Sequence, residues 1–198
     1  KLSPVQPLLI AIGQEGGRVS RLPAEFTIFP PCGQLGQCNS SELAYSAAAT
    51  IAKELRAVGI NMNMAPVLDV NSNPDNPVIG DRAFGAAPEL VGEMGSATIG
   101  GLQDNMVVAC GKHFPGHGDT ATDSHKELPV VDAGLQRLRD TEFPPFQQAI
   151  RYGVASLMTA HVLYRALDPE APATLSSAVI QRLLREEFRY EGVVFTDD

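Results

Sequence analysis

The sequence has no tryptophan, only three cysteines and fewer basic than acidic residues. Its 23 acids and 15 bases give a formal net charge of -8, and such a surface repels phosphate backbones, which argues against a nucleic-acid partner. No apolar run reaches the roughly 18 residues of a membrane-spanning helix. The cysteines form no CxxC pair. Cys32 and Cys38 flank two glycines in a predicted loop, and we expect free thiols there rather than a disulfide bond.

Both ends of the chain look cut. It begins at Lys1 without a methionine and ends at Asp198 directly after an apolar run, so we expect a piece of a longer protein. The absence of a signal peptide therefore does not decide the compartment.

Short apolar runs alternate with helical patterns along the chain, whose composition is that of one globular domain. The expected strands are residues 7–12, 60–70, 106–110, 155–160 and 192–196. The expected helices are residues 43–55, with Ser40 and Ser41 as cap candidates, 88–102, 135–152 and 177–188. This alternation predicts an α/β fold with a parallel sheet covered by helices, either part of a (β/α)8 barrel or a doubly wound sheet.

Polar side chains follow the ends of the predicted strands. In a barrel the carboxyl ends of all strands meet on one face, where active sites lie. The residues concerned are Gln14, Glu15, Asp69, Asn71, Lys112, His113, His161, Asp197 and Asp198.

The densest chemistry lies in residues 112–125, KHFPGHGDTATDSH, with three histidines, two aspartates and a lysine. Asp123 and His125 are two positions apart, so the carboxylate can orient the imidazole and stabilise its cation. Such a histidine could protonate a leaving oxygen. The alternative is a solvated loop whose histidines cap nearby backbone groups.

Three further segments carry weaker signals. FTDD places Asp197 after a strand, as a nucleophile, a metal ligand or a helix cap. GQEGGRVSR follows the first strand, where its two glycines could cradle an anion. NPVIGDRAFG offers Arg82, either to a substrate or to a surface pair with Asp81.

Taken in order, QEGGRV, APVLDV, GDRAFG, KHFPGHGDTATDSH, MTAHV and FTDD resemble the β-N-acetylglucosaminidase branch of glycoside hydrolase family 3 over nearly all of residues 1–198. The resemblance implies one (β/α)8-type catalytic domain, incomplete in this chain, with barrel before Pro7 and after Asp198. By itself the chain is then expected to fold poorly. The activity implied is removal of terminal β-linked N-acetylglucosamine, as from peptidoglycan fragments, by a monomer that needs no metal or cofactor. A bacterial cytoplasmic location is expected, with export or lipid anchoring as alternatives.

The resemblance also assigns roles to individual residues. Asp197 matches the nucleophile of the family, and Asp123 and His125 match its acid/base dyad. Sugar contacts fall on Arg21, Arg82, Lys112 and His113, and His161 matches a histidine near the site. The implied reaction retains configuration through a glycosyl-enzyme intermediate, and an acid/base histidine leaves phosphorolysis open as a second step.

One departure from the family pattern is Gly13, where the family carries an aspartate that grips sugar hydroxyls. Its absence weakens sugar binding and keeps a non-catalytic sugar-binding relative as one alternative. A metal-dependent hydrolase is the other. Its ligands would come from His113, His117, Asp119, Asp123 and His125.

Overall fold

The computed structural model describes residues 8–122 and 128–197 and shows an α/β fold. Its parallel sheet follows the order of the chain, with each strand beside the next one, as in a barrel and unlike a doubly wound sheet. The strands are β1 (Ala11–Ile12), β2 (Met62–Asn63), β3 (Val108–Phe114), β5 (Ser156–Thr159) and β7 (Val193–Thr196). A separate pair joins β4 (Val130–Val131) to β6 (Leu163–Tyr164).

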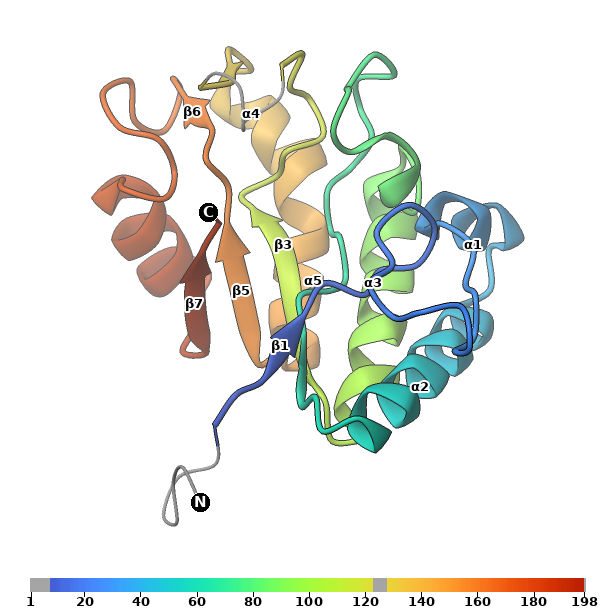
Figure 1. Cartoon of the computed structure of the whole chain (residues 1–198). Helices are drawn as coiled ribbons and strands as arrows, with labels where there is room; N and C mark the ends of the chain where they lie inside the picture. Colours follow the sequence, from blue (N-terminus) through green and yellow to red (C-terminus); the bar gives the residue numbers. More distant parts are fainter. Residues whose placement is uncertain (1–7, 123–127, 198) are drawn as a thin grey trace.

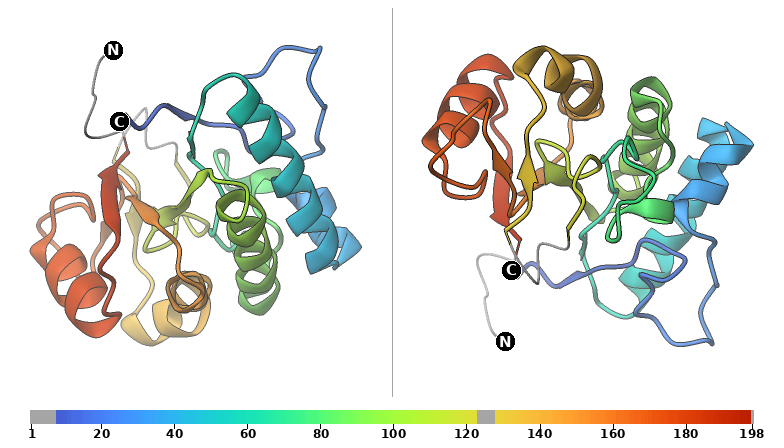
Figure 2. Two further views of the ribbon diagram at one scale, coloured as in Figure 1. Left: turned by 90° about the horizontal axis from the view of Figure 1, so that it is seen from below. Right: turned by 90° about the horizontal axis from the view of Figure 1, so that it is seen from above.

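All the larger helices cover one face of this sheet. In Figure 1 α5 lies behind the strands and α3 and α2 lie beside them to the right, and Figure 2 shows the helices as an arc around the strands. The described residues therefore form a half-barrel, not a complete one. The helical segments are α1 (Cys32–Cys38), α2 (Ser41–Ala57), η1 (Gly80–Arg82), α3 (Pro88–Gln103), α4 (Leu135–Arg137), η2 (Leu138–Glu142), α5 (Phe143–Tyr152) and η3 (Ala178–Glu187).

The first two helices of the expected set, α2 and α3, form as predicted. Ser40 caps α2, since its side chain accepts a hydrogen bond from the amide of Leu43. The two helices then touch at backbone distance at Gly101, where a Cβ atom would lie 2.4 Å from the carbonyl oxygen of Tyr45. Glycine is required at that crossing because any side chain would separate the helices.

The helix predicted for residues 135–152 forms without a break, but its middle segment η2 is a π-helix, which is wider than an α-helix. Pro144 and Pro145 have no amide hydrogen, so they cannot bond to the carbonyl groups of the preceding turn. The chain accommodates them at the start of α5. Gly153 ends the helix in the left-handed conformation, with φ of 95°.

The predicted strands near the N-terminus are too long. Leu8, Leu9 and Ile10 are about half exposed, at 52%, 53% and 51%, so the expected buried strand begins only at β1. Side chains hold the flanking backbone: Asn61 donates to the carbonyl of Leu8 and accepts from the amide of Ile10. These side-chain bonds stand in for ladder bonds.

Two other expectations about local structure are wrong. The strand predicted for residues 106–110 begins at Val108 and continues to Phe114, so Lys112 and His113 belong to β3 rather than to a loop. The stretch between Cys32 and Cys38 is the helix α1. Its two ends separate the two thiols, and both cysteines are free, as predicted.

None of the helices in residues 8–122 and 128–197 is long and apolar enough to cross a membrane.

Candidate active site

A cavity of about 310 Å³ gathers polar side chains that follow the carboxyl ends of the strands. Five of the predicted site residues line it together, although the sequence spreads them from position 21 to position 197. Asp123 and His125, the predicted acid/base pair, lie outside the described residues. The full lining is Gly13, Glu15, Val19, Arg21, Val78, Arg82, Lys112, His113, His117, Met158 and Asp197.

Glu15 is the electrostatic centre of this wall. Its buried carboxylate accepts two hydrogen bonds from Arg82, of 2.9 and 2.8 Å, and lies 2.6 Å from the ammonium nitrogen of Lys112. Burial alone would raise the pKa of Glu15, but the Arg82 hydrogen bonds and the Lys112 charge lower it to about 2. The anion therefore holds two cations in fixed positions at the cavity.

The charge on Arg82 is secured by the same contacts. Burial would lower the pKa of its guanidinium, but the bonds to Glu15 and the charges of Asp69 and Asp197 raise it overall. The suggested surface pair of Arg82 with Asp81 is wrong, because Asp81 pairs with Arg18 at 3.0 Å instead.

Asp69 fixes two histidines of the cavity wall, as Glu15 fixes the two cations. It is fully buried, and its Oδ2 lies 2.7 Å from Nδ1 of His113, while its Oδ1 accepts from the amides of His113 and His117. Burial would raise the pKa of Asp69, but the His113 contact lowers it to about 2. An Nδ1–H bond to Asp69 fixes the ring of His113 and leaves Nε2 as its acceptor nitrogen in the neutral tautomer.

Asn76 fastens the loop before η1 to the loop after β3. Its amide nitrogen donates to the carbonyls of His117 and Gly118, and its oxygen accepts from the amides of Val78 and Ile79. Both loops contribute to the cavity, so this one side chain sets their separation.

Glu15 and Asp69 hold side chains of the cavity wall in place, although the sequence assigned neither of them a role. Both were visible as polar residues after strands, but nothing in the sequence says which acid faces which cation. That pairing depends on contacts across 67 positions for Glu15 with Arg82 and 44 for Asp69 with His113.

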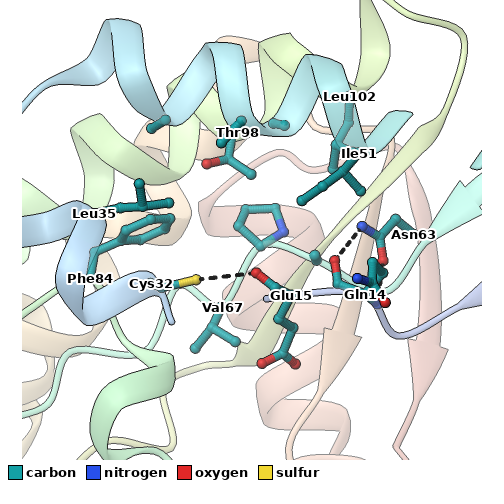
Figure 3. A pocket seen from close by; sticks show the side chains of 15 residues that line it. Gln14, Glu15, Cys32, Leu35, Ile51, Asn63, Val67, Phe84, Thr98 and Leu102 are labelled. Carbon is teal, nitrogen blue, oxygen red and sulfur yellow. Dashed lines mark hydrogen bonds between the residues drawn. The ribbon is translucent and has the colours of Figure 1, made fainter. Parts of the chain in front are cut away.

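A second, much smaller cavity of about 20 Å³ lies behind Glu15, under α2 and α3. Figure 3 shows the Glu15 carboxylate pointing away from it, while the Glu15 carbonyl oxygen faces the thiol of Cys32 at 3.8 Å. Burial raises the pKa of the Cys32 thiol to about 12, so this sulfur is a packing group rather than a nucleophile. The space suits about one water molecule.

The glycines of GQEGGRVSR do not form the anion cradle that the sequence suggests for them. The amide of Gly16 donates to Val19 and that of Gly17 donates to Phe29, so both donors are used inside the protein. Gly16 and Gly17 have positive φ angles of 98° and 54°, and they turn the chain so that Glu15 faces Arg82.

His161, expected near the site, does not line the cavity; its Nδ1 lies 2.8 Å from the hydroxyl of Thr174. Of the five residues that the metal-dependent alternative names, Asp123 and His125 lie outside the described residues, and Asp119 pairs with Arg137. His113 contacts Asp69, and His117 contacts Thr120 at 2.8 Å. Within residues 8–122 and 128–197, no group of three histidine, cysteine or acidic side chains is arranged to hold a metal.

Asp197 follows strand β7 and lines the cavity beside the ordered cations Arg82 and Lys112 and the histidines. Residues 3–198 match the glycosyl hydrolase family 3 N terminal domain, and the chain belongs to this family.

The similar proteins indicate a narrower class of enzyme than the family alone. The β-hexosaminidase of Thiobacillus denitrificans is 41% identical over 198 residues, which cover 97% of this chain and 55% of that protein. The family 3 β-N-acetylglucosaminidase structure from Paenibacillus sp. str. FPU-7 gives a TM-score of 0.95 at 54% identity, covering 97% of this chain and 37% of that one. NagZ from Neisseria gonorrhoeae, solved with N-trifluoroacetyl-D-glucosamine, gives 0.91 at 38% identity, covering 96% and 58%. The chain thus spans about half the length of the curated relatives it matches.

Proposed function

We propose that the protein containing this chain is a retaining β-N-acetylglucosaminidase that removes terminal β-linked N-acetylglucosamine. The observation that carries the proposal is the shared cavity, in which Asp197 stands with Arg82, Lys112 and His113. The named activities of the relatives, β-hexosaminidase and β-N-acetylglucosaminidase, support the choice of sugar.

The cavity wall is suited to bind a neutral sugar through its hydroxyl groups. Lys112 has three donor hydrogens and commits one to Glu15, and the Nε2 of His113 is not used by Asp69. Arg21 adds a guanidinium at an exposed part of the wall. Because Glu15 and Asp69 fix these groups in advance, little ordering cost falls on substrate binding.

In the proposed mechanism the Asp197 carboxylate attacks the anomeric carbon and forms a glycosyl ester, while His125, oriented by Asp123, protonates the departing oxygen. His125 then takes a proton from water, and the water cleaves the ester with net retention. The assignment of Asp123 and His125 rests on the Asp-x-His sequence and the family resemblance.

The source of the sugar is proposed to be peptidoglycan fragments, with chitooligosaccharides as the second candidate. The N-trifluoroacetyl-D-glucosamine bound in the N. gonorrhoeae relative supports an N-acyl glucosamine at the reacting position.

The test uses the full-length protein and p-nitrophenyl N-acetyl-β-glucosaminide. Asp197→Asn should lower kcat at least roughly 10³-fold on this substrate. Because nitrophenolate leaves readily without a proton, the His125→Ala variant is assayed on a chitooligosaccharide, where loss of the general acid should lower kcat about 10²–10⁴-fold. The matched control is Asp132→Asn, because Asp132 is a 70% exposed partner of Arg165. It should leave kcat unchanged.

Three results would contradict the proposal in different ways. An Asp197→Asn protein with full turnover would remove Asp197 as nucleophile. An inert wild type that binds N-acetylglucosamine would identify a sugar-binding relative, which the absence of a side chain at Gly13 favours. Activity lost on treatment with a strong chelator and restored by zinc would identify the metal-dependent hydrolase.

A further inference from the structure

Glu142 is a buried acid that the proposed mechanism does not use. Its side chain is 0% exposed at the end of η2, and it does not line the cavity. Its Oε1 lies 3.5 Å from the hydroxyl of Ser72 and 3.5 Å from Nη2 of Arg137. Its Oε2 is buried and has no hydrogen-bond partner among the residues that the structure describes. Buried acids are costly, so this one calls for a physical account.

The backbone of Gly116 lies directly against this side chain. A Cβ atom at Gly116 would lie 2.8 Å from the Cβ and 3.0 Å from the Cγ of Glu142. The carbonyl of Gly116 also accepts a hydrogen bond of 2.5 Å from the hydroxyl of Tyr164. Gly116 therefore contacts both Glu142 and Tyr164. It also lies between His113 and His117 in the chain, and both histidines line the cavity.

A second contact joins the same two segments. The Nη2 atom of Arg137 is 3.5 Å from Glu142 and also 3.5 Å from Oδ1 of Asp119. Asp119 follows His117 by two residues, on the loop side of the contact. The partly exposed guanidinium of Arg137 therefore contacts two carboxylates, that of Glu142 on the helix and that of Asp119 on the loop.

The surroundings favour the uncharged acid. Burial raises the pKa of Glu142 to about 7; the charge of Arg137 opposes this rise, and the charge of Asp119 adds to it. Tyr164, which faces the same space, stays neutral because burial raises its pKa well above the ordinary value. When Glu142 is neutral, Arg137 forms its ion pair with Asp119 alone. When Glu142 is ionised, two negative charges compete for the single guanidinium of Arg137.

We propose that Glu142 is a positioning residue for the glycosidase. Its side chain packs directly against Gly116 and thereby fixes the positions of His113 and His117 on the cavity wall. The inference rests on the proposed function for its effect on turnover. Its structural part, the support of residues 113–119, does not.

The first experiment compares Glu142→Gln, Glu142→Ala and the wild type in the full-length protein, using the nitrophenyl substrate from pH 5 to 9. Glu142→Gln keeps the shape of the neutral acid, so it should retain activity at pH 6 within about threefold. Its activity should also extend to higher pH, because glutamine cannot ionise. Glu142→Ala removes the support and should lower kcat/KM roughly 10–100-fold, as expected for a displaced cavity wall.

The matched control is Glu187→Gln, the same chemical change in an exposed pair with Arg139. It should leave the whole pH profile unchanged. A purely structural acid would alter the unfolding temperature without moving the alkaline limb, so an unmoved limb in Glu142→Gln overturns the proposal. So does a folded Glu142→Gln protein that is as impaired as Glu142→Ala. If Glu142→Ala fails to fold, the pH profile of Glu142→Gln decides.

The second experiment does not depend on activity, so it separates this inference from the proposed function. Amide hydrogen exchange of residues 113–119 should accelerate in Glu142→Ala and stay at the wild-type rate in Glu187→Gln. An inert wild type with accelerated exchange in Glu142→Ala would overturn the glycosidase but keep the support of the loop. Unchanged exchange would overturn the support itself.

Discussion

At the scale of single residues, Gly13 is the position where the cavity wall lacks a side chain. A Cβ atom there would meet nothing within 4 Å, so the space around it is open. The neighbouring lining is rich in charge, from Glu15 and Arg21 to Asp197. Gly13 therefore marks a part of the cavity that this chain leaves without a contact of its own.

Restoring a carboxylate should strengthen binding. Gly13→Asp is expected to lower KM for the nitrophenyl substrate about tenfold or more, since a hydrogen bond to a charged group contributes roughly 1.5–3 kcal/mol. Gly13→Ala is the control, because it fills the same open space without a polar atom, and its KM should match that of the wild type. A Gly13→Asp protein with unchanged or weaker binding would mean that the sugar does not reach this part of the wall.

The sequence pointed to the residues that carry charge toward the cavity, and it placed Glu15 and Asp69 on the same face without a role. Arg82 and Lys112 stand out in loops and strand ends, where chemistry is expected. The carboxylate between them belongs to Glu15, and only the fold reveals that it turns inward. Residues of this kind are missed because their role depends on partners far along the chain.

At the scale of elements, the crossing of α2 and α3 depends on Gly101. A Cβ atom there would lie 2.4 Å from the Tyr45 carbonyl oxygen, 2.7 Å from the Ala48 Cβ and 2.9 Å from the Ala49 nitrogen. These are backbone and packed atoms of α2, which cannot move away without moving the helix. The crossing is therefore set by the absence of a side chain.

The same substitution at two glycines of α3 should have opposite effects. Gly101→Ala is expected to lower the free energy of unfolding by about 1–3 kcal/mol, because it forces the helices apart. Gly92→Ala meets mainly the flexible end of Gln148, at 2.4 Å. Its better helix propensity should raise the free energy of unfolding by about 0.5–1 kcal/mol. Urea denaturation of both variants checks this; equal effects would contradict the crossing contact.

The long helices were predictable because their apolar period extends over several turns, and capping residues such as Ser40 mark their starts. The short strands were not. β1 and β2 have two residues each, and side chains hold the backbone around them, as Asn63 does by donating to and accepting from Gln14. Nothing in the sequence of an apolar run indicates that the side chain of an asparagine in it will bond to the backbone of the neighbouring strand.

At the scale of the whole molecule, two buried carboxylates make stability depend on acid pH. The pKa of Glu15 is lowered from 4.5 to about 2, and that of Asp69 from 3.8 to about 2. A lowered carboxyl pKa stabilises the fold above the unfolded-state value. That stabilisation is lost as pH falls toward the folded-state value.

The free energy of unfolding should therefore fall between about pH 5 and pH 2, by on the order of 2–3 kcal/mol for each carboxylate. Glu15→Gln should be less stable at pH 7, because Arg82 and Lys112 lose their partner, but its stability should fall less steeply with acid. Urea denaturation at pH 7, 5 and 3 measures this, with the exposed Glu187→Gln as control. A wild type of constant stability over this range would contradict the buried ion contacts.

The half-barrel itself was predictable in class, because strand and helix patterns alternate. Its curvature was not, because barrel and open sheet share the same periodicity. The strand order from β1 to β7, which follows the chain without reversal, separates the two architectures.

The order in which the cavity wall is encoded has a consequence for synthesis. All but two of the lining residues lie between positions 13 and 117, whereas Asp197 comes last. On a ribosome, the nascent chain therefore exposes most of the cavity residues before Asp197 leaves the exit tunnel. The complete lining exists only once β7 and the residue after it have been synthesised, so any chain that stops short of position 197 lacks that carboxylate.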